Sequence, residues 1–185
     1  MAMRSAAWQT YNFGPAYSGE KFVFGACRPG YEIDPPIQSI HVHNWLKFMT
    51  FHGIRRVVCL LDSGQLRLYQ DNLITTYSDH FGREHVCHTP IPDYHLIDPC
   101  TLHDQILPFL SDSIQMHQPV VVHCSGGIGR TGHILAAWLV FGRGFNSAAA
   151  IDAIRQGPAH RDPLEAIHTG KVTWSELENL LSGNT

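Results

Sequence analysis

One stretch restricts the possible folds more than any other part of the sequence: Val120-Val-Val-His-Cys-Ser-Gly-Gly-Ile-Gly-Arg-Thr-Gly132. Its first four residues, Val120–His123, are rich in β-branched side chains and predict a buried strand. A helical pattern begins at Arg130 and runs to Gly142, and only a short glycine-rich turn lies between the two. Because a strand that passes at once into a helix is the repeating unit of a helix-covered parallel sheet, the stretch predicts an α/β fold.

The remaining segments fit the same fold, because strand-like and helix-like patterns alternate before Val120 and only helical patterns follow His123. The further strands are predicted at Phe22–Ala26, Arg56–Leu61 and His85–Ile91. The other helices are predicted at Ile37–Phe51, Gly64–Tyr77, Thr101–Met116, Ser147–Gln156 and Trp174–Leu181. Pro108 is unusual inside one of these helices, whereas Asn146 and the capping box Thr173 and Glu176 start the last two.

The composition favours one soluble domain. The chain has 185 residues, 44% of them hydrophobic, and a chain of this length buries roughly 70% of its unfolded surface without needing disulfides. We therefore expect a single domain over residues 1–185, with residues 1–20 as an amino-terminal extension packed on the core. A net charge of −3 provides no basic surface for nucleic acid. The longest apolar run, Ile134–Phe141, is too short to span a membrane, and we expect a cytoplasmic protein.

The glycine-rich turn has the composition of a site for a tetrahedral anion. Gly126, Gly127 and Gly129 allow backbone N–H groups to point inwards, and the following helix adds positive potential at its amino terminus. Cys124 begins the turn and Arg130 ends it, so a thiolate and a bidentate guanidinium can face the same bound atom. Cys124 is therefore predicted to be a nucleophile, and His123, directly before it, to support the turn through a hydrogen bond.

The sequence from His123 to Gly132, His-Cys-Ser-Gly-Gly-Ile-Gly-Arg-Thr-Gly, resembles the signature of the protein tyrosine phosphatase superfamily. The resemblance extends from Phe24-Gly-Ala-Cys-Arg-Pro-Gly30 to the closing helices, and the chain length is similar to that of the compact dual-specificity group. It implies a central sheet of four or five mostly parallel strands flanked by helices. It also implies hydrolysis without a metal or other cofactor, through a cysteinyl-phosphate, and a Thr131 hydroxyl that helps the thiolate to leave.

A general acid is needed to protonate the leaving group, and two aspartates compete for this role. Asp93, in Ile91-Pro-Asp-Tyr-His95, lies 31 residues before Cys124, which is similar to the spacing in the resembling family. Asp98 is followed by Pro99 and a helical pattern, which is the arrangement of a helix N-cap. We therefore predict Asp93 as the acid of the first step and the base of the second.

The turn residues that would bind the phosphate carry no charge: Ser125, Gly126, Gly127, Ile128 and Gly129. Related enzymes that act on inositol phosphates often place lysine there, so phosphoproteins are the predicted substrates. Phosphotyrosine is preferred, because it can reach a deep turn, and phosphoserine and phosphothreonine are further candidates. A phosphoinositide or inositol phosphate phosphatase is the first alternative, since Arg28, Arg155 or Arg161 could supply charge from elsewhere. A silent phosphate-binding module and a rhodanese-type sulfurtransferase are the other two.

The remaining cysteines and histidines provide weaker indications of function than the glycine-rich turn does. The resemblance implies that a second cysteine on a neighbouring strand can protect the nucleophile in a disulfide. Cys59 is the candidate for such a bond with Cys124, although an ordinary core position explains this residue better. The chain has 13 histidines, but their spacing matches no metal motif, and we predict no metal site.

Overall fold

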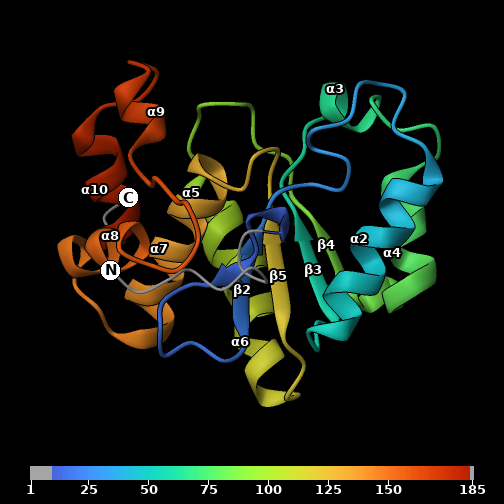
Figure 1. Cartoon of the computed structure of the whole chain (residues 1–185). Coiled ribbons are helices and arrows are strands. Elements are labelled where there is room, and N and C mark those ends of the chain that lie inside the picture. The colour runs from blue at the N-terminus through green and yellow to red at the C-terminus, as the bar shows by residue number, and fades with distance from the viewer. Residues whose placement is uncertain (1–9, 184–185) are drawn as a thin grey trace.

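The computed structural model describes residues 10–183 and contains a five-stranded sheet with the strand order β1-β2-β5-β3-β4 (Figure 1). The strands are β1 (Gly14–Pro15), β2 (Val23–Ala26), β3 (Arg56–Cys59), β4 (Val86–His88) and β5 (Val120–His123). Only β1 is antiparallel to its neighbour, and the other strands are parallel. The predicted α/β fold with a mostly parallel sheet of four or five strands is therefore confirmed.

Helices cover both faces of this sheet (Figure 1). On one face, α2 (Ser39–Phe51) and α4 (Leu73–Phe81) pack on the strands through a core that includes Trp45, Met49 and Tyr77. The core of the other face is formed with α6 (Leu107–Gln115), α7 (Gly129–Arg143), α8 (Ser147–Arg155) and α10 (Trp174–Ser182). Strand β5 lies in the middle and is buried along its whole length. The turn that follows β5 is therefore held by packing from both layers.

The predicted helix Gly64–Tyr77 is wrong, because the structure has two short helices there. These are α3 (Ser63–Leu66) and α4, which begins at Leu73 after the N-cap Asn72. Between them the chain turns and forms one bridge to a distant residue: Ile37 N donates to Leu68 O, and Ile37 O accepts from Gln70 N. A helix through this segment would lose these bonds and the burial of Tyr69, so tertiary pairing prevails over local helical propensity.

The segment around Pro108 is helical, as predicted, but it is not one uniform α-helix. A single turn, α5 (Pro99–Thr101), leads into a π-helical segment over Leu102–Ile106 and then into α6. Pro108 falls in the first turn of α6, directly after the π-helical segment, where the missing N–H costs least. The short helix α9 (Glu165–His168) was not predicted from the sequence.

The described part of the amino-terminal extension packs on the core, while residues 1–9 lie outside the described residues. Phe13 and Ala16 are buried, and the buried Glu20 carboxylate pairs with Arg143 at 2.9 Å and accepts a hydrogen bond from Trp138 Nε1 at 3.0 Å. Over residues 10–183, no helix is both long and apolar enough to cross a membrane.

Candidate active site

The turn from Cys124 to Arg130 is held from outside by its carbonyl groups. Ser125 O accepts a hydrogen bond from Arg28 N at 2.9 Å, and Gly126 O accepts one from Asn12 Nδ2 at 3.1 Å. Gly127 O accepts from the Arg161 guanidinium. In a trans peptide the next N–H points away from the carbonyl, so the N–H groups that follow these carbonyls turn towards the inside of the turn. The result is a concave group of donors of the kind that binds anions.

Gly127 is required by two features of the turn. Its φ is +69°, in the left-handed region that favours glycine. A Cβ at this position would also collide with the backbone of Ala26 and would lie 2.7 Å from Cys27 N. The turn can therefore lie directly against the end of β2 only because this residue has no side chain.

The Cys124 side chain lies at the bottom of this turn and is 3% exposed. The Thr131 hydroxyl, on the first turn of α7, donates a hydrogen bond to Cys124 Sγ at 3.2 Å. A hydroxyl that donates to the sulfur stabilises negative charge on it.

His123 is fully buried and neutral. Its Nδ1 lies 3.2 Å from Cys124 O and therefore carries the hydrogen, while Nε2 accepts from the Tyr77 hydroxyl at 3.1 Å. Burial lowers the pKa of His123 to about 3, although the hydrogen bond to Cys124 acts in the opposite direction. A group with so low a pKa does not take up a proton near neutral pH. Its contacts agree with the predicted supporting role.

Arg130 is held in place by two hydrogen bonds and carries an acidic partner. Its Nη1 donates to Gln65 Oε1 at 2.8 Å and to Ile91 O at 2.9 Å, and its Nη2 lies 3.0 Å from Asp93 Oδ1. The Arg130 side chain is 2% exposed, whereas that of Asp93 is 46% exposed. The guanidinium is thus fixed from behind, and Asp93 reaches it from the solvent side.

The segment that carries Asp93 is anchored at both ends. Ile91 N donates to Leu60 O at 3.1 Å, and Ile97 N donates to His133 Nε2 on α7 at 3.2 Å. Burial lowers the pKa of His133 to about 3, so its ring stays neutral and available as an acceptor. Between the anchors the chain lies at the surface, where a loop can move.

Asp98 has the structural role predicted for it. It is the N-cap of α5, with its carboxylate accepting from Thr101 N at 2.8 Å and from Thr101 Oγ1 at 3.0 Å, and Pro99 follows in the first turn. The Thr101 backbone and hydroxyl hydrogen bonds lower the pKa of Asp98. The cap occupies this carboxylate, while Asp93 contacts Arg130.

The three arginines considered as sources of extra charge differ in position. Arg28 and Arg161 are both buried beside the turn, and their guanidinium groups donate hydrogen bonds to protein oxygens. Burial lowers the pKa of Arg161 to about 10, while Cys124 and Cys27 raise it. Arg155 is about half exposed, 3.9 Å from Asp162. The Arg161 guanidinium thus holds the backbone of the turn at Gly127, and that of Arg28 contacts the Ser125 hydroxyl and the carbonyls of its own loop.

A disulfide between Cys59 and Cys124, the alternative to an ordinary core role for Cys59, remains a hypothesis, and all five cysteines are unpaired thiols in the structure. Cys59 lies opposite His123 in the β3–β5 register, one residue from Cys124. Burial raises its pKa to about 12, so Cys124 would have to be oxidised first and Cys59 would then attack it. After mild peroxide treatment, mass spectrometry should find a Cys59–Cys124 peptide pair. A Cys124 that is sulfinylated without any such pair would refute the disulfide.

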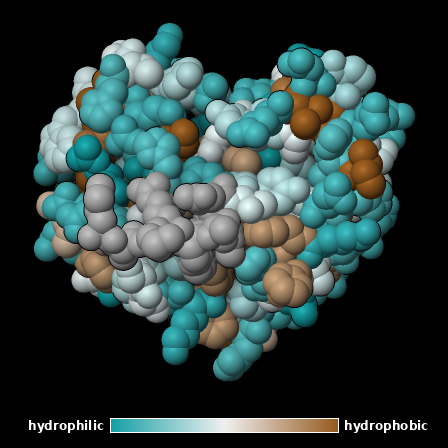
Figure 2. Space-filling model, viewed as in Figure 1, coloured by the Kyte–Doolittle hydropathy of each residue, from teal (hydrophilic) through white to brown (hydrophobic). Residues whose placement is uncertain are grey.

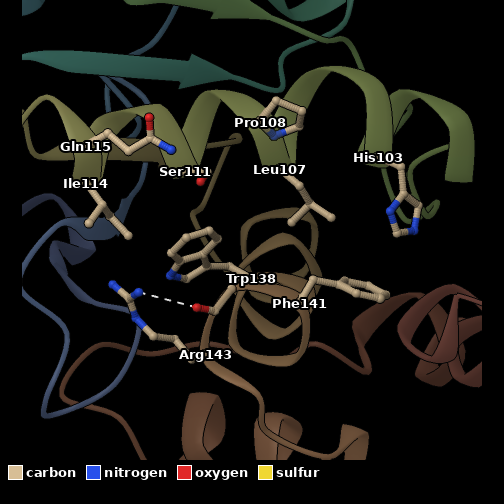
Figure 3. A pocket seen from close by; sticks show the side chains of 10 residues that line it. His103, Leu107, Pro108, Ser111, Ile114, Gln115, Trp138, Phe141 and Arg143 are labelled. Carbon is tan, nitrogen blue, oxygen red and sulfur yellow. Dashed lines mark hydrogen bonds between the residues drawn. The ribbon is translucent and has the colours of Figure 1, made fainter.

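The protein has one pocket beside this turn and another at a distance from it. Figure 2 shows a notch at the top of the molecule, between the parts that carry α9 and α3 in Figure 1. A pocket of about 550 Å³ lies beside the turn and is lined in part by Gly126, Ile128 and Tyr31. Another pocket, of about 430 Å³, lies between α6 and the end of α7 (Figure 3). Phe141, in that pocket, is 12 residues along α7 from Gly129, roughly 18 Å.

Two residues at the turn were not predicted from the sequence. Gln65 contacts Arg130, and Glu165 of α9 lies against Gly129. The pattern Asp62-Ser-Gly-Gln65 is a capping box, which could have indicated the start of α3 but not its position beside Arg130. No local pattern marks Glu165. Within residues 10–183, no three His, Cys, Asp or Glu side chains are placed to hold a metal ion.

Comparisons with known proteins agree with this geometry. The dual specificity protein phosphatase OPG106 of vaccinia virus (strain Western Reserve) is 34% identical over 55 residues, 30% of this chain and 32% of the viral protein. The match thus spans about a third of that relative's length.

Two solved structures share the fold over most of their length. P. aeruginosa TpbA in complex with pTyr has 17% identity, 97% coverage of both chains and a TM-score of 0.58. PTPMT1 in complex with PI(5)P has 14% identity, 92% coverage of this chain, 95% of that chain and a TM-score of 0.62.

A family model matches residues 33–143, more than half of the chain, and its description is "Polymorphic toxin system, DSP-PTPase phosphatase". The matched range includes Asp93, Cys124 and Arg130. The chain therefore belongs to the family that this model, Tc-R-P, describes, and it is a compact, dual-specificity-like member of the protein tyrosine phosphatase superfamily.

Proposed function

We propose that the protein is a cysteine-dependent phosphatase that hydrolyses phosphate monoesters of phosphoproteins, with phosphotyrosine preferred over phosphoserine and phosphothreonine. The observation that carries the proposal is the convergence of three groups on one turn. Cys124 Sγ lies at its base, Arg130 closes it, and Asp93 reaches Arg130 from the solvent side at 3.0 Å. The proposal assigns the catalytic unit to residues 1–185 and retains the predicted cytoplasmic location.

In the first step, the Cys124 thiolate attacks phosphorus and the bond to the leaving oxygen breaks, which forms a cysteinyl-phosphate. The N–H groups of residues 125–129 and the Arg130 guanidinium stabilise the phosphoryl oxygens, since both are in place before the substrate binds. Asp93 takes up a proton from solvent when it leaves Arg130, and in this protonated form it gives the proton to the leaving oxygen. The Asp93–Arg130 ion pair has to rearrange for this, because the bound phosphate takes over the guanidinium.

In the second step, water attacks the same phosphorus and Asp93, now a carboxylate, takes up a proton from it. Inorganic phosphate forms and the thiolate leaves. The hydrogen bond from Thr131 Oγ1 to Cys124 Sγ is in position to stabilise this leaving thiolate. No cofactor takes part in either step.

Two observations favour a phosphoprotein over a phosphoinositide. The turn residues Ser125–Gly129 carry no charge, and the nearby Arg28 and Arg161 are engaged with the protein. The Tyr31 ring lies beside the turn, with its hydroxyl 3.1 Å from where a Cβ on Gly126 would be, and offers an aromatic wall to a phenyl phosphate. The pTyr complex of TpbA agrees with this preference, whereas the PI(5)P complex of PTPMT1 supports the phosphoinositide alternative.

The proposal is tested by phosphate release from a phenyl phosphate ester in the presence of a metal chelator. We expect turnover that is unaffected by the chelator and inhibited by vanadate. Phosphotyrosine peptides, phosphoserine peptides and phosphoinositides are then compared at equal concentration, and the first should have the highest kcat/KM. Absence of turnover on every substrate would favour the silent binding module, although that reading does not explain why Cys124, Arg130 and Asp93 are all present.

A further inference from the structure

Glu165, the first residue of α9, fills the space beside the last glycine of the turn. A Cβ placed on Gly129 would collide with Glu165 Oε2 and would lie 2.7 Å from Glu165 Cβ and 2.8 Å from its carboxyl carbon. The backbone N–H of Gly129 is near enough to the carboxylate to favour its charged form. Gly129 directly precedes Arg130, so this carboxylate lies at the part of the turn where a phosphate would meet both the backbone and the guanidinium.

The surroundings of Glu165 combine like and opposite charges. Asp93 comes from the loop after β4, Asp162 from the segment before α9, and Arg130 from α7. Asp162 is itself paired with His168, at 2.9 Å, and with Arg155, at 3.9 Å. Burial raises the pKa of Glu165, and Asp93 and Asp162 raise it further, while Arg130 and the Gly129 backbone lower it. The Glu165 carboxylate is therefore repelled by Asp93 and Asp162, while Arg130 and the Gly129 backbone, two groups that would also bind a phosphate, favour its charged form.

We propose that Glu165 occupies part of the anion site in the free protein and competes with the substrate phosphate for Gly129 and Arg130. This inference rests on the proposed function and concerns the same turn. Two anions cannot share these donors without repulsion, so binding of a dianion requires the Glu165 carboxylate to turn away or to take up a proton. The charge of Glu165 then sets how tightly the turn binds phosphate.

The competition should depend on pH in a defined direction. A carboxyl group with a raised pKa takes up its proton at a higher pH than an ordinary glutamate. As the pH falls through that range, Glu165 becomes neutral and the turn binds a fixed dianion more tightly. A variant that lacks the carboxylate should lose this part of the pH dependence, because it has no charge to remove.

Sulfate is a suitable probe, because it is tetrahedral and stays a dianion over the pH range used. Calorimetric titration of the whole chain compares wild type with Glu165→Gln, which keeps the shape and removes the charge. We expect sulfate to bind the variant roughly tenfold more tightly at pH 7.5, and the advantage to shrink at pH 5.5. Glu178→Gln, on the exposed surface of α10, makes the same change in net charge and should leave the affinity unchanged.

A second variant, Glu165→Ser, keeps the Cβ beside Gly129 and should change sulfate affinity in the same direction, and melting temperatures verify that each variant folds. Wild type that binds sulfate and hydrolyses the phenyl phosphate ester, together with variants that bind sulfate no better, would overturn the competition and leave the proposed function intact. An equal gain in Glu178→Gln would also overturn it, since net charge alone would then be the cause. Wild type that binds no sulfate would overturn both proposals, because the turn would not be an anion site.

Discussion

Replacement of Cys124 by serine should reduce phosphate release to below detection. The serine hydroxyl occupies nearly the same volume, but it is not ionised near neutral pH and no base lies behind it to remove its proton. Thr131 Oγ1, which donates to Cys124 Sγ at 3.2 Å, can only donate to or accept from the new hydroxyl. The measurement is single-turnover and steady-state phosphate release from a phenyl phosphate ester.

The same variant provides its own control, because the loss should be confined to chemistry. Cys124→Ser should still bind sulfate and should keep a melting temperature close to that of wild type, since the turn is held by Arg28, Asn12 and Arg161 rather than by the sulfur. As a comparison, Cys87→Ser changes a thiol on β4 without touching the turn and should retain turnover. Turnover by Cys124→Ser near the wild-type rate would exclude the proposed nucleophile.

Replacement of Asp93 by alanine should lower kcat by about 10²–10⁴-fold, the range expected for the loss of a general acid. The effect should depend on the leaving group. A poor leaving group such as an alkyl-substituted phenol needs the proton, whereas 4-nitrophenol leaves with little help. We therefore expect the largest loss with the least acidic phenol and a much smaller one with 4-nitrophenyl phosphate, measured as kcat across a series of aryl phosphates.

Two further variants separate this role from a structural one. Asp93→Asn keeps the size of the side chain and a contact to Arg130 but cannot donate the proton, so it should show the same dependence on the leaving group. Asp98→Ala should lower the melting temperature slightly through loss of the α5 cap and leave kcat close to that of wild type. A greater loss of kcat in Asp98→Ala than in Asp93→Ala, or a loss that is equal for all leaving groups, would contradict the assignment.

The elements that the sequence predicted well are those whose local patterns agree with their tertiary setting. Val120–His123 is the strand β5 as predicted, and the N-cap Asn146 and the capping box of Thr173 and Glu176 start α8 and α10. Each of these signals involves residues a few positions apart, and the packing does not oppose them. The prediction of one helix over residues 64–77 was wrong because Ile37, which is distant in sequence, forms a bridge with the middle of this segment and interrupts the helix.

The candidate site shows the same division between local and distant residues. Cys124 directly follows β5, and Arg130 and Thr131 lie in the first turn of α7, so their proximity is a matter of local geometry. Asp93 could be predicted only from its spacing, because its distance from Arg130 depends on how β4 packs beside β3. No pattern placed Gln65 or Glu165 at the site: the capping box of Gln65 indicates the start of a helix, but a polar residue in a short helix gives no indication of what it will face.

The sequence by itself determined that a strand, a glycine-rich turn and a helix present a thiol and a guanidinium to one point, because backbone geometry over so few residues leaves little freedom. Only the tertiary structure decided what surrounds that point. The parallel order β2-β5-β3-β4 brings loops that are distant in sequence to one edge of the sheet. There, Gln65 contacts Arg130 from one side and Glu165 contacts Gly129 from the other. Long-range packing of this kind is set by the whole core and leaves no periodic pattern in the residues that it brings together.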